Sequence, residues 1–339
     1  MMWNYFLPAV YSMIPLFLIT ALGFFLVRLK KIGPAFIRSL SYFLINVALP
    51  CWLFTKLIRT GRENLFSSLL FPGAAFFIIA LGFLLGIITF FLWRVRDKQR
   101  AAGWAMAGLG NSGYLPLAIS SSLPMALPAI APFLPEETAA LYIGMYLVIM
   151  NPLLWTFGNY LVAGDLGKPR FGDLLTPPAI SVLVGVLVVL LDGSRFWNDT
   201  FSPFYYLINT LETLGAMTLP TVLICLGGSI GQTSLEGFKS GGKQLRFTAA
   251  VMTVRLLLMP GFFFLLYAVF RRFFDLQPVQ YWVLFLEMVT PPATNLAVMA
   301  IRAEKNEGLV AETLLFSYLG YFLLFPFYLA LFLSLPLFH

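Results

Sequence analysis

Two short groups of polar and helix-breaking residues interrupt hydrophobic stretches of this 339-residue chain. They are Asn111, Ser112, Gly113 and Tyr114 in the first stretch, and Thr290, Pro291, Thr294 and Asn295 in the second. Side-chain amides and hydroxyls donate and accept hydrogen bonds, so they can orient a polar ligand. The residue types therefore indicate a ligand-binding site inside an apolar part of the protein.

The second group lies within a hydrophobic segment, residues 279–301, that is long enough to cross a bilayer. Pro291 and Pro292 each lack a backbone N–H, and each ring clashes with the carbonyl four residues earlier, so a regular helix must break there. In hydrocarbon each freed backbone group costs several kcal/mol unless protein or water satisfies it. A broken helix with polar residues at the break is typical of a transporter site, whereas a proline kink repaired by neighbouring helices is the alternative.

The composition is that of an integral membrane protein. Hydrophobic residues make up 60% of the chain and charged residues 11%, unlike any soluble domain. A spanning helix needs about 20 mostly apolar residues, so the length allows about ten spans with short loops. We predict an all-α protein with ten transmembrane helices, at residues 11–27, 34–57, 69–95, 101–126, 138–162, 177–191, 204–230, 245–270, 279–301 and 309–335. The apolar residues 1–10 either extend the first helix or lie in the interface.

The distribution of positive charge predicts the orientation, because cytoplasmic loops carry an excess of Lys and Arg. Of the 22 basic residues, fifteen lie in odd-numbered loops and six in even-numbered loops, while Arg255 lies inside a span. We therefore predict a multi-pass protein of the cell (inner) membrane with cytoplasmic odd-numbered loops and both termini outside. Loop 2 argues against this orientation, because it carries Lys56, Arg59 and Arg62.

The ten predicted spans are interpreted as two five-helix repeats, residues 1–162 and 177–339, joined by a cytoplasmic linker at 163–176. Because five is odd, two tandem copies must be inverted relative to each other across the membrane. In span 2 the pair Leu49-Pro50 corresponds to Leu219-Pro220 in span 7.

The two polar breaks also correspond in this alignment. When the repeats are aligned, residues 111–116 in span 4 face residues 290–295 in span 9. Two broken helices in corresponding spans are the strongest sequence indication of a binding site in this class of protein. If the spans cross at their breaks, the helix N-termini suit a carboxylate and the carbonyl ends suit a cation.

Ionisable residues inside spans are costly, at about 2.5–3.5 kcal/mol for a charge at mid-bilayer on insertion scales, and each needs a reason. Glu287 precedes Pro291 by four residues. It either binds a coupling cation such as Na⁺, carries a proton, or pairs structurally with Arg255. Arg255 either faces an anionic substrate or pairs with Glu287 or Glu212. Asn46 lies four residues before Pro50, so the two residues share one face of the helix. The Asn46 side chain either points toward the site at the two breaks or forms a hydrogen bond to another helix.

Several functions are disfavoured by the residues present. Cys51 and Cys225 both lie in apolar segments and give neither a disulfide framework nor a metal site, and the one histidine is His339. No intramembrane aspartate pair or histidine cluster supports an enzyme, and we expect no cofactor beyond a coupling ion. The net charge of +7 follows the loop topology and indicates no nucleic-acid partner.

The order and spacing of these motifs resemble the auxin efflux carrier family, which includes bacterial members and plant PIN-type carriers. The motifs are Asn46 with Leu49-Pro50, residues 110–116 and residues 291–295, and the resemblance covers essentially the whole chain. It implies the fold of bile-acid sodium symporters: spans 1, 2, 6 and 7 form a scaffold, and spans 3–5 and 8–10 form a transport domain with spans 4 and 9 crossing. It also implies organic-anion transport by an elevator-like motion, and a homodimer formed through the scaffold.

The resemblance further implies that Asn111 and Asn46 line the site, because they match site asparagines of PIN-type carriers. The long cytoplasmic loop of plant carriers is absent here, since loop 5 has about fourteen residues. This favours a bacterial-type carrier of a malate- or malonate-like carboxylate. The alternatives are an efflux carrier for an auxin-like or other amphipathic organic acid, and a non-transporting membrane sensor. Glu287 resembles an acidic residue of the symporters' sodium-site segment, but the glutamine-asparagine pattern after it is missing, so the coupling ion stays open.

Overall fold

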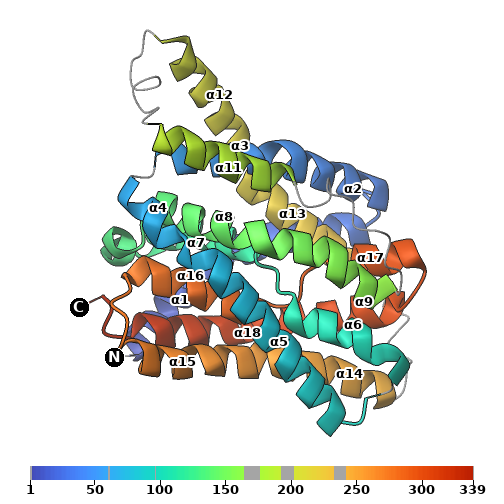
Figure 1. Ribbon diagram of the computed structural model, residues 1–339. Helices are drawn as coiled ribbons and strands as arrows, with labels where there is room; N and C mark the ends of the chain where they lie inside the picture. Colours follow the sequence, from blue (N-terminus) through green and yellow to red (C-terminus); the bar gives the residue numbers. More distant parts are fainter. Residues whose placement is uncertain are drawn as a thin grey trace.

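The structure is a computed structural model that describes residues 2–59, 62–95, 97–163, 176–191, 202–232 and 242–338. Helices joined by short non-helical connections make up these ranges, and one isolated β-bridge is the only extended pairing there (Figure 1). Seven of the described helical segments are long and apolar enough to cross a membrane. The all-α membrane class predicted from the sequence is therefore confirmed.

Most helices coincide with the predicted spans to within a few residues, whereas α1 starts earlier and α4 lies in predicted loop 2. Those of the first half are α1 (Met2–Arg28), α2 (Pro34–Phe43), α3 (Leu49–Ile58), α4 (Arg62–Ser68), α5 (Leu70–Leu92), α6 (Asp97–Gly108), α7 (Tyr114–Ala126), α8 (Glu136–Leu153) and α9 (Asn159–Ala163). Those of the second half are α11 (Pro177–Leu190), α12 (Pro203–Ala216), α13 (Thr218–Gly231), α14 (Gly242–Met252), α15 (Met259–Phe270), α16 (Pro278–Val289), α17 (Asn295–Ala303) and α18 (Glu307–Leu333). A 3₁₀ turn, η2 (Pro128–Phe133), precedes α8. The proposed linker at 163–176 lies almost wholly outside the described residues.

The first helix begins at Met2, so residues 2–10 extend it. Predicted spans 1, 2, 3, 5, 7, 8 and 10 each contain one of the seven long apolar segments. The remaining three are shorter, because spans 4 and 9 are broken in the middle and α11 of span 6 has only 14 residues. The two breaks lie where the sequence placed them.

Three spans contain a short π-helical turn beside a proline: η1 (Leu44–Ala48), η3 (Leu154–Gly158) and η6 (Thr253–Leu258). Pro260 cannot donate to the carbonyl of Leu256, four residues earlier. The hydroxyl of Tyr328 on α18 donates to that carbonyl at 2.5 Å. A neighbouring helix thus satisfies the backbone group that the proline leaves free, as hydrocarbon surroundings require.

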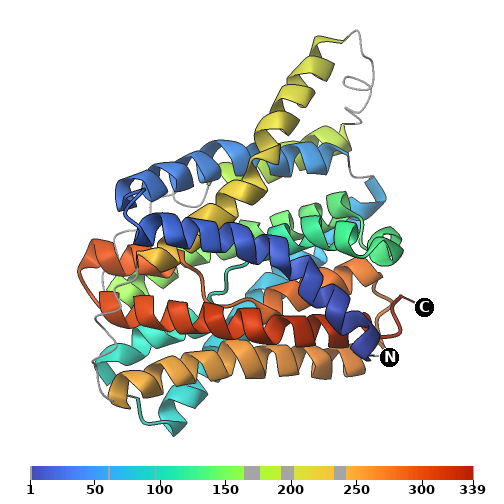
Figure 2. The same ribbon diagram turned by 180° about the vertical axis from the view of Figure 1, so that it is seen from behind.

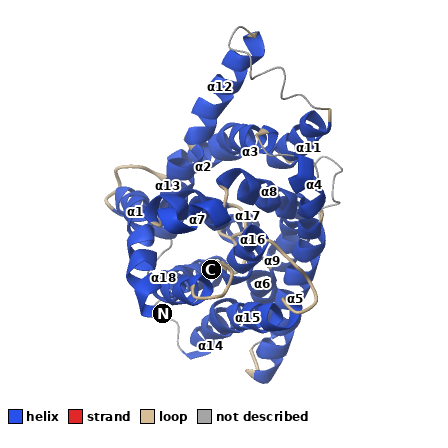
Figure 3. Cartoon of the chain, turned by 90° about the vertical axis from the view of Figure 1, so that its left-hand side faces the viewer, coloured by secondary structure: helices blue, strands red, loops and turns tan. Residues whose placement is uncertain are grey.

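The helices pack into two groups that meet at the middle of the molecule (Figures 1 and 3). One group contains α1, α2, α3, α11 and α13, and the upper part of α12 projects beyond it. The other contains α5, α6 and α14 to α18. α1 of the first group and α18 of the second lie side by side, as Figure 2 shows. α8 contacts both α3 and α5, so it lies between the groups.

Glycines allow close contact in two helix pairs, α1 with α13 and α5 with α6. A Cβ on Gly227 of α13 would lie 1.8 Å from the carbonyl oxygen of Thr20 on α1, and one on Gly82 of α5 would lie 2.8 Å from the carbonyl of Ala107 on α6. Only glycine permits backbones to approach this closely, which is how helices associate in lipid. These glycines act as packing residues.

Ion pairs link the C-terminal end of α3 to the start of α8 and to α12. Lys56 lies 3.0 Å from Glu136 and 3.6 Å from Glu137, and Arg59 lies 2.5 Å from Glu212. These contacts connect the end of predicted span 2 with the start of span 5 and with the interior of span 7. They offset positive charge in loop 2, which is the loop that argued against the predicted orientation. They also show that Glu212 pairs with Arg59, so the suggested pairing of Glu212 with Arg255 is wrong.

Candidate functional site

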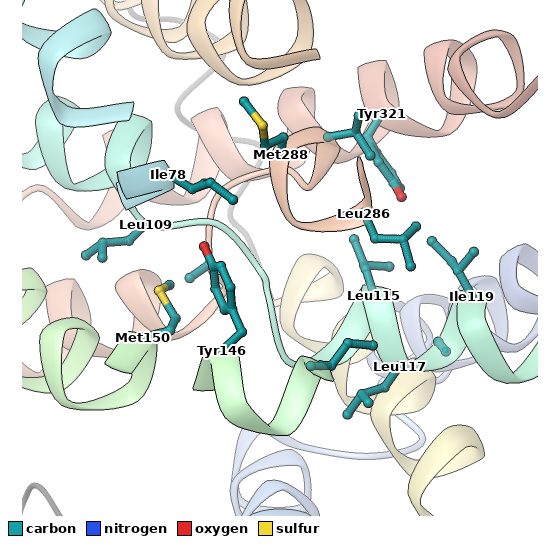
Figure 4. Packing of buried hydrophobic residues seen from close by; sticks show 14 of the residues in the cluster. Ile78, Leu109, Leu115, Leu117, Ile119, Tyr146, Met150, Leu286, Met288 and Tyr321 are labelled. Carbon is teal, nitrogen blue, oxygen red and sulfur yellow. The ribbon is translucent and has the colours of Figure 1, made fainter. Parts of the chain in front are cut away.

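Two interrupted helices form the centre of the molecule. α6 ends at Gly108 and α7 begins at Tyr114, while α16 ends at Val289 and α17 begins at Asn295. Each interruption is therefore five residues long. Figure 4 shows the first as an extended connection between Leu109 and Leu115, with Tyr146 and Met150 of α8 beside it.

The two interruptions pair with each other through their backbones. Gly110 and Pro292 form an antiparallel bridge. The N–H of Asn111 donates to the carbonyl of Pro291 at 2.8 Å, and the N–H of Ala293 donates to the carbonyl of Leu109 at 3.0 Å. Non-helical backbone inside a membrane must find partners in the protein, and here each break supplies them for the other. We call this paired region the crossing.

Side chains from other helices satisfy the remaining carbonyls of the second break. The hydroxyl of Tyr318 on α18 donates to the carbonyl of Pro292 at 3.2 Å and accepts a hydrogen bond from the Asn111 amide. The Arg255 guanidinium in η6 donates to the Thr290 carbonyl at 2.9 Å and to its hydroxyl at 2.8 Å. The crossing is thus tied to two long helices as well as to itself.

Glycine at position 110 is required by this arrangement. A Cβ there would lie 1.9 Å from a guanidinium nitrogen of Arg255 and 2.5 Å from the Thr290 hydroxyl oxygen. No side chain fits unless the guanidinium moves away. By contrast, a Cβ on Gly113 would meet its nearest neighbour, Leu147, at an ordinary 3.6 Å.

A pocket opens beside the crossing, between the two helix groups. Its cavity volume is about 50 Å³. From the crossing it is lined by Gly110, Asn111, Ser112, Gly113, Ala293 and Asn295. Its other walls are Ile45 and Leu49 of span 2, Thr176 and Pro178 at the start of α11, and Leu147, Met150, Asn151, Leu154 and Trp155 of span 5. The N-terminal ends of α7 and α17 both face this pocket.

The structure brings four of the predicted binding residues to the pocket wall: Asn111, Ser112, Gly113 and Asn295. Thr290, Pro291 and Thr294 are buried in the crossing and do not line it. Tyr114 is the first residue of α7, and its side chain lies outside what the structure describes. Asn46 follows the lining residue Ile45, but its amide donates back to the Tyr42 carbonyl at 2.8 Å.

Glu287 and Arg255, the two fully or almost fully buried ionisable residues named from the sequence, do not line the pocket. Glu287 is fully buried, and neither of its carboxyl oxygens has a hydrogen-bond partner among the described residues. Arg255 is 1% exposed and interacts electrostatically with Glu287, although the two form no salt bridge. The buried Ser112 hydroxyl lies close to the Glu287 carboxyl without the geometry of a hydrogen bond. The Glu287 carboxyl therefore lies next to Ser112, a residue of the first break.

Sequence reasoning missed Tyr318, Tyr146 and Trp155. Tyr318 holds the crossing, fully buried Tyr146 interacts with both Glu287 and Arg255, and Trp155 forms part of the pocket wall. Each is an aromatic residue in an apolar span. Membrane helices carry many such residues, so their type and spacing alone give no signal of a site.

The chain matches a family described as "Membrane transport protein" over residues 8–170 and 166–329. The chain belongs to this family. It is the auxin efflux carrier family that the motifs at the crossing resemble. Membership supports a multi-pass membrane protein and a transporter rather than an enzyme.

Individual relatives of this transport family are distant. An uncharacterized transporter from Methanothermobacter thermautotrophicus is 22% identical over 316 residues, covering 92% of this chain and 94% of that protein. Arabidopsis thaliana PIN-LIKES 5 is 27% identical over 134 residues, 38% of this chain and 32% of that protein. PIN-LIKES 7 is 24% identical over 178 residues, 50% of this chain and 43% of that protein. The chain thus spans less than half the length of these plant relatives.

Proposed function

We propose that the protein is a secondary active transporter of a small organic anion, and that the pocket at the crossing is its binding site. The observation that carries the proposal is the position of the pocket. It lies between two groups of helices and against two broken helices whose N-terminal ends face it. In membrane carriers such half-helix ends bind the charged part of the substrate.

The chemistry of the pocket wall suits a carboxylate. A helix N-terminus carries unpaired N–H groups and about half a positive charge. The first turn of α7 has no side-chain cap. We assign the carboxylate to the N-terminal ends of α7 and α17. Asn111 and Asn295 orient it through their amides, and a malate- or malonate-like acid is the first candidate.

The proposed motion follows from the fact that both groups of helices contribute residues to the pocket wall. The crossing and span 5 supply most of the lining, whereas Ile45, Leu49 and Pro178 belong to the other group of helices. If the inverted-repeat scaffold and transport domain exist as predicted, the two groups slide past each other in an elevator-like step. The ligand then moves with the crossing while the facing wall changes. A homodimer through the scaffold would anchor this step.

The proposed coupling residue is Glu287. Its buried carboxyl lies beside Ser112, a pocket-wall residue, and near the carbonyl end of α16. A cation or a proton bound there would offset the carboxylate charge and alter the crossing next to it. Na⁺ and H⁺ both remain candidates. Gradient-driven uptake in sodium-free buffer, with and without a protonophore, distinguishes them.

A second candidate substrate is favoured by the rest of the wall. Eight lining side chains are apolar or aromatic: Ile45, Leu49, Leu147, Met150, Leu154, Trp155, Pro178 and Ala293. A small dicarboxylate has little apolar surface to bury against this wall. An amphipathic acid with an aromatic ring would bury its ring there. An auxin-like organic acid is therefore the alternative substrate class.

Flux into proteoliposomes tests the proposal and separates the two candidates. Purified protein is reconstituted, and uptake of radiolabelled malonate, malate and indole-3-acetate is measured against empty liposomes. Saturable uptake of one class, inhibited by its unlabelled form, supports transport of that class. Binding of these acids in a thermal-shift assay without any flux would instead support the non-transporting sensor and contradict the carrier. Neither binding nor flux for any carboxylate would contradict the organic-anion site.

A further inference from the structure

A second hollow is lined by residues of α5, α15 and α16 and of the connection between the last two. Figure 1 labels these three helices in the group that contains the crossing. Its cavity volume is about 290 Å³. Its lining is almost wholly apolar: Leu70, Gly73, Ala74, Phe77 and Ile78 from α5, Phe263, Leu266, Tyr267 and Phe270 from α15, and Phe274, Leu276, Tyr281, Leu284 and Met288 from the connection and α16. We call it the lateral groove. It shares no lining residue with the pocket at the crossing.

The lateral groove is elongated along the helices. It starts at the first residue of α5, Leu70, and ends at Ile78, eight residues further on. At a rise of 1.5 Å per residue this is about 12 Å. Ile78 and Met288 lie near each other at its inner end (Figure 4). A narrow apolar channel of this length, open to the side of a membrane protein, suits a hydrocarbon chain.

Positive charge lies at the outer end of the lateral groove. Arg271 and Arg272 directly follow Phe270, both are exposed, and neither forms a salt bridge with any described residue. The Arg271 guanidinium lies 5.8 Å from the ring centroid of Tyr267, which lines the groove. Asp275 is the single acidic residue of this connection, so the end of the groove has a net positive charge.

We propose that the lateral groove binds one acyl chain of an anionic phospholipid, with the phosphate held by Arg271 and Arg272. The apolar lining accepts the acyl chain of any lipid, because the chain leaves one hydrocarbon environment for another and gains no net transfer free energy. The two guanidinium groups, which bind phosphate in a fork geometry, select the anionic one. The proposal is independent of the substrate at the crossing and of whether the protein transports it.

The structure offers a plug for the groove and a matched control. An ideal Cβ on Gly73 has no atom within 4 Å, so a larger side chain can enter the groove without a clash. Gly261 on α15 also has no atom within 4 Å of its Cβ. The lining residues of α15 follow the spacing of one helix face, and Gly261 lies on the opposite face. Gly73→Phe fills the groove, whereas Gly261→Phe adds the same bulk elsewhere.

Native mass spectrometry of the purified full chain tests the proposal. The probes are equal amounts of dioleoylphosphatidylglycerol and dioleoylphosphatidylcholine. The wild type is expected to retain phosphatidylglycerol several-fold over phosphatidylcholine. Gly73→Phe should lose this bound lipid at least fivefold, whereas Gly261→Phe should match the wild type. Gly73→Leu, a smaller plug, is measured in parallel, and only monodisperse protein is compared.

The charge assignment is tested with the double variant Arg271→Gln and Arg272→Gln. It should still bind lipid, but with a phosphatidylglycerol to phosphatidylcholine ratio near one. Wild-type lipid retention in both Gly73 variants would overturn the groove as the binding site. An unchanged preference for phosphatidylglycerol in the arginine double variant would overturn the headgroup site.

Discussion

The side-chain amide of Asn111 donates a hydrogen bond of 2.5 Å to the hydroxyl of Tyr318, and the same hydroxyl donates to the carbonyl of Pro292. A tyrosine hydroxyl has one proton, so once it donates to a carbonyl it can only accept from the asparagine. The chain of bonds therefore has one direction. It joins the first break, α18 and the second break, and it fixes the orientation of an amide on the pocket wall.

This relationship predicts the behaviour of Tyr318→Phe. The change leaves the Asn111 amide and the Pro292 carbonyl without their partner, but keeps the ring. We expect a loss of about 1 kcal/mol in stability, as for other hydrogen bonds between membrane helices. A pocket amide that is no longer oriented should raise KM about fivefold, with little change in maximal flux. Thermal unfolding and proteoliposome flux measure the two effects.

Tyr328→Phe is the matched control for that variant. Its hydroxyl also donates to a backbone carbonyl, that of Leu256, but it touches neither break. It should lower stability by a similar amount and leave KM unchanged. An equal increase of KM in both variants would show that Tyr318 acts on overall stability and not on the pocket.

Gly110→Ala should be far more damaging than Gly113→Ala. The added methyl at position 110 would overlap the Arg255 guanidinium, and overpacking of this kind costs about 1–3 kcal/mol. The methyl at position 113 meets only Leu147 at 3.6 Å. We expect reduced yield and a lower unfolding temperature for the first variant, and near wild-type stability for the second. Comparable stability of the two would contradict the close approach at the crossing.

The positions of the breaks could be predicted from the sequence because proline and glycine act locally. Pro291 and Pro292 cannot continue a helix, and the polar residues beside them have no other place in an apolar span. The breaks were found at five residues each, where predicted. The composition likewise determined the membrane class, because hydrophobic content is a property of the whole chain.

The partners of the crossing could not be predicted in the same way. Tyr318 lies 207 residues from Asn111, and nothing in its neighbourhood distinguishes it from the other tyrosines of the spans. The predicted site also contained both faces of each break, whereas the structure turns Thr290 toward Arg255 and Asn295 toward the pocket. Which face of a non-helical segment is exposed depends on tertiary packing, and no sequence period describes it.

The buried pair of Glu287 and Arg255 gives a further prediction. Arg255→Gln leaves Glu287 buried without a positive charge nearby and weakens the bonds to Thr290. Hydrogen bonds made by a charged group, such as those from Arg255 to Thr290, are typically worth about 1.5–3 kcal/mol each. We therefore expect Arg255→Gln to unfold readily. The double variant with Glu287→Gln should recover part of the lost stability, which thermal unfolding of both proteins measures.

Glu287→Gln alone separates coupling from structure. If the carboxyl carries the coupling ion or proton, this variant should fold and exchange labelled substrate across the membrane, but fail to accumulate it against a gradient. Counterflow and gradient-driven uptake, measured on the same proteoliposomes, provide the comparison. Full gradient-driven accumulation by Glu287→Gln would leave the residue with only its structural role beside Arg255.

The central claim is that the crossing binds the transported anion. The most direct test is flux by the double variant Asn111→Ala and Asn295→Ala, which removes the two pocket amides next to the breaks while leaving the backbone of the crossing in place. Asn209→Ala on α12, outside the pocket lining, is the control. We predict that the double variant, purified as monodisperse protein, loses at least tenfold in Vmax/KM for the transported acid while the control keeps the wild-type value. Unchanged flux in the double variant would contradict the assignment of the site.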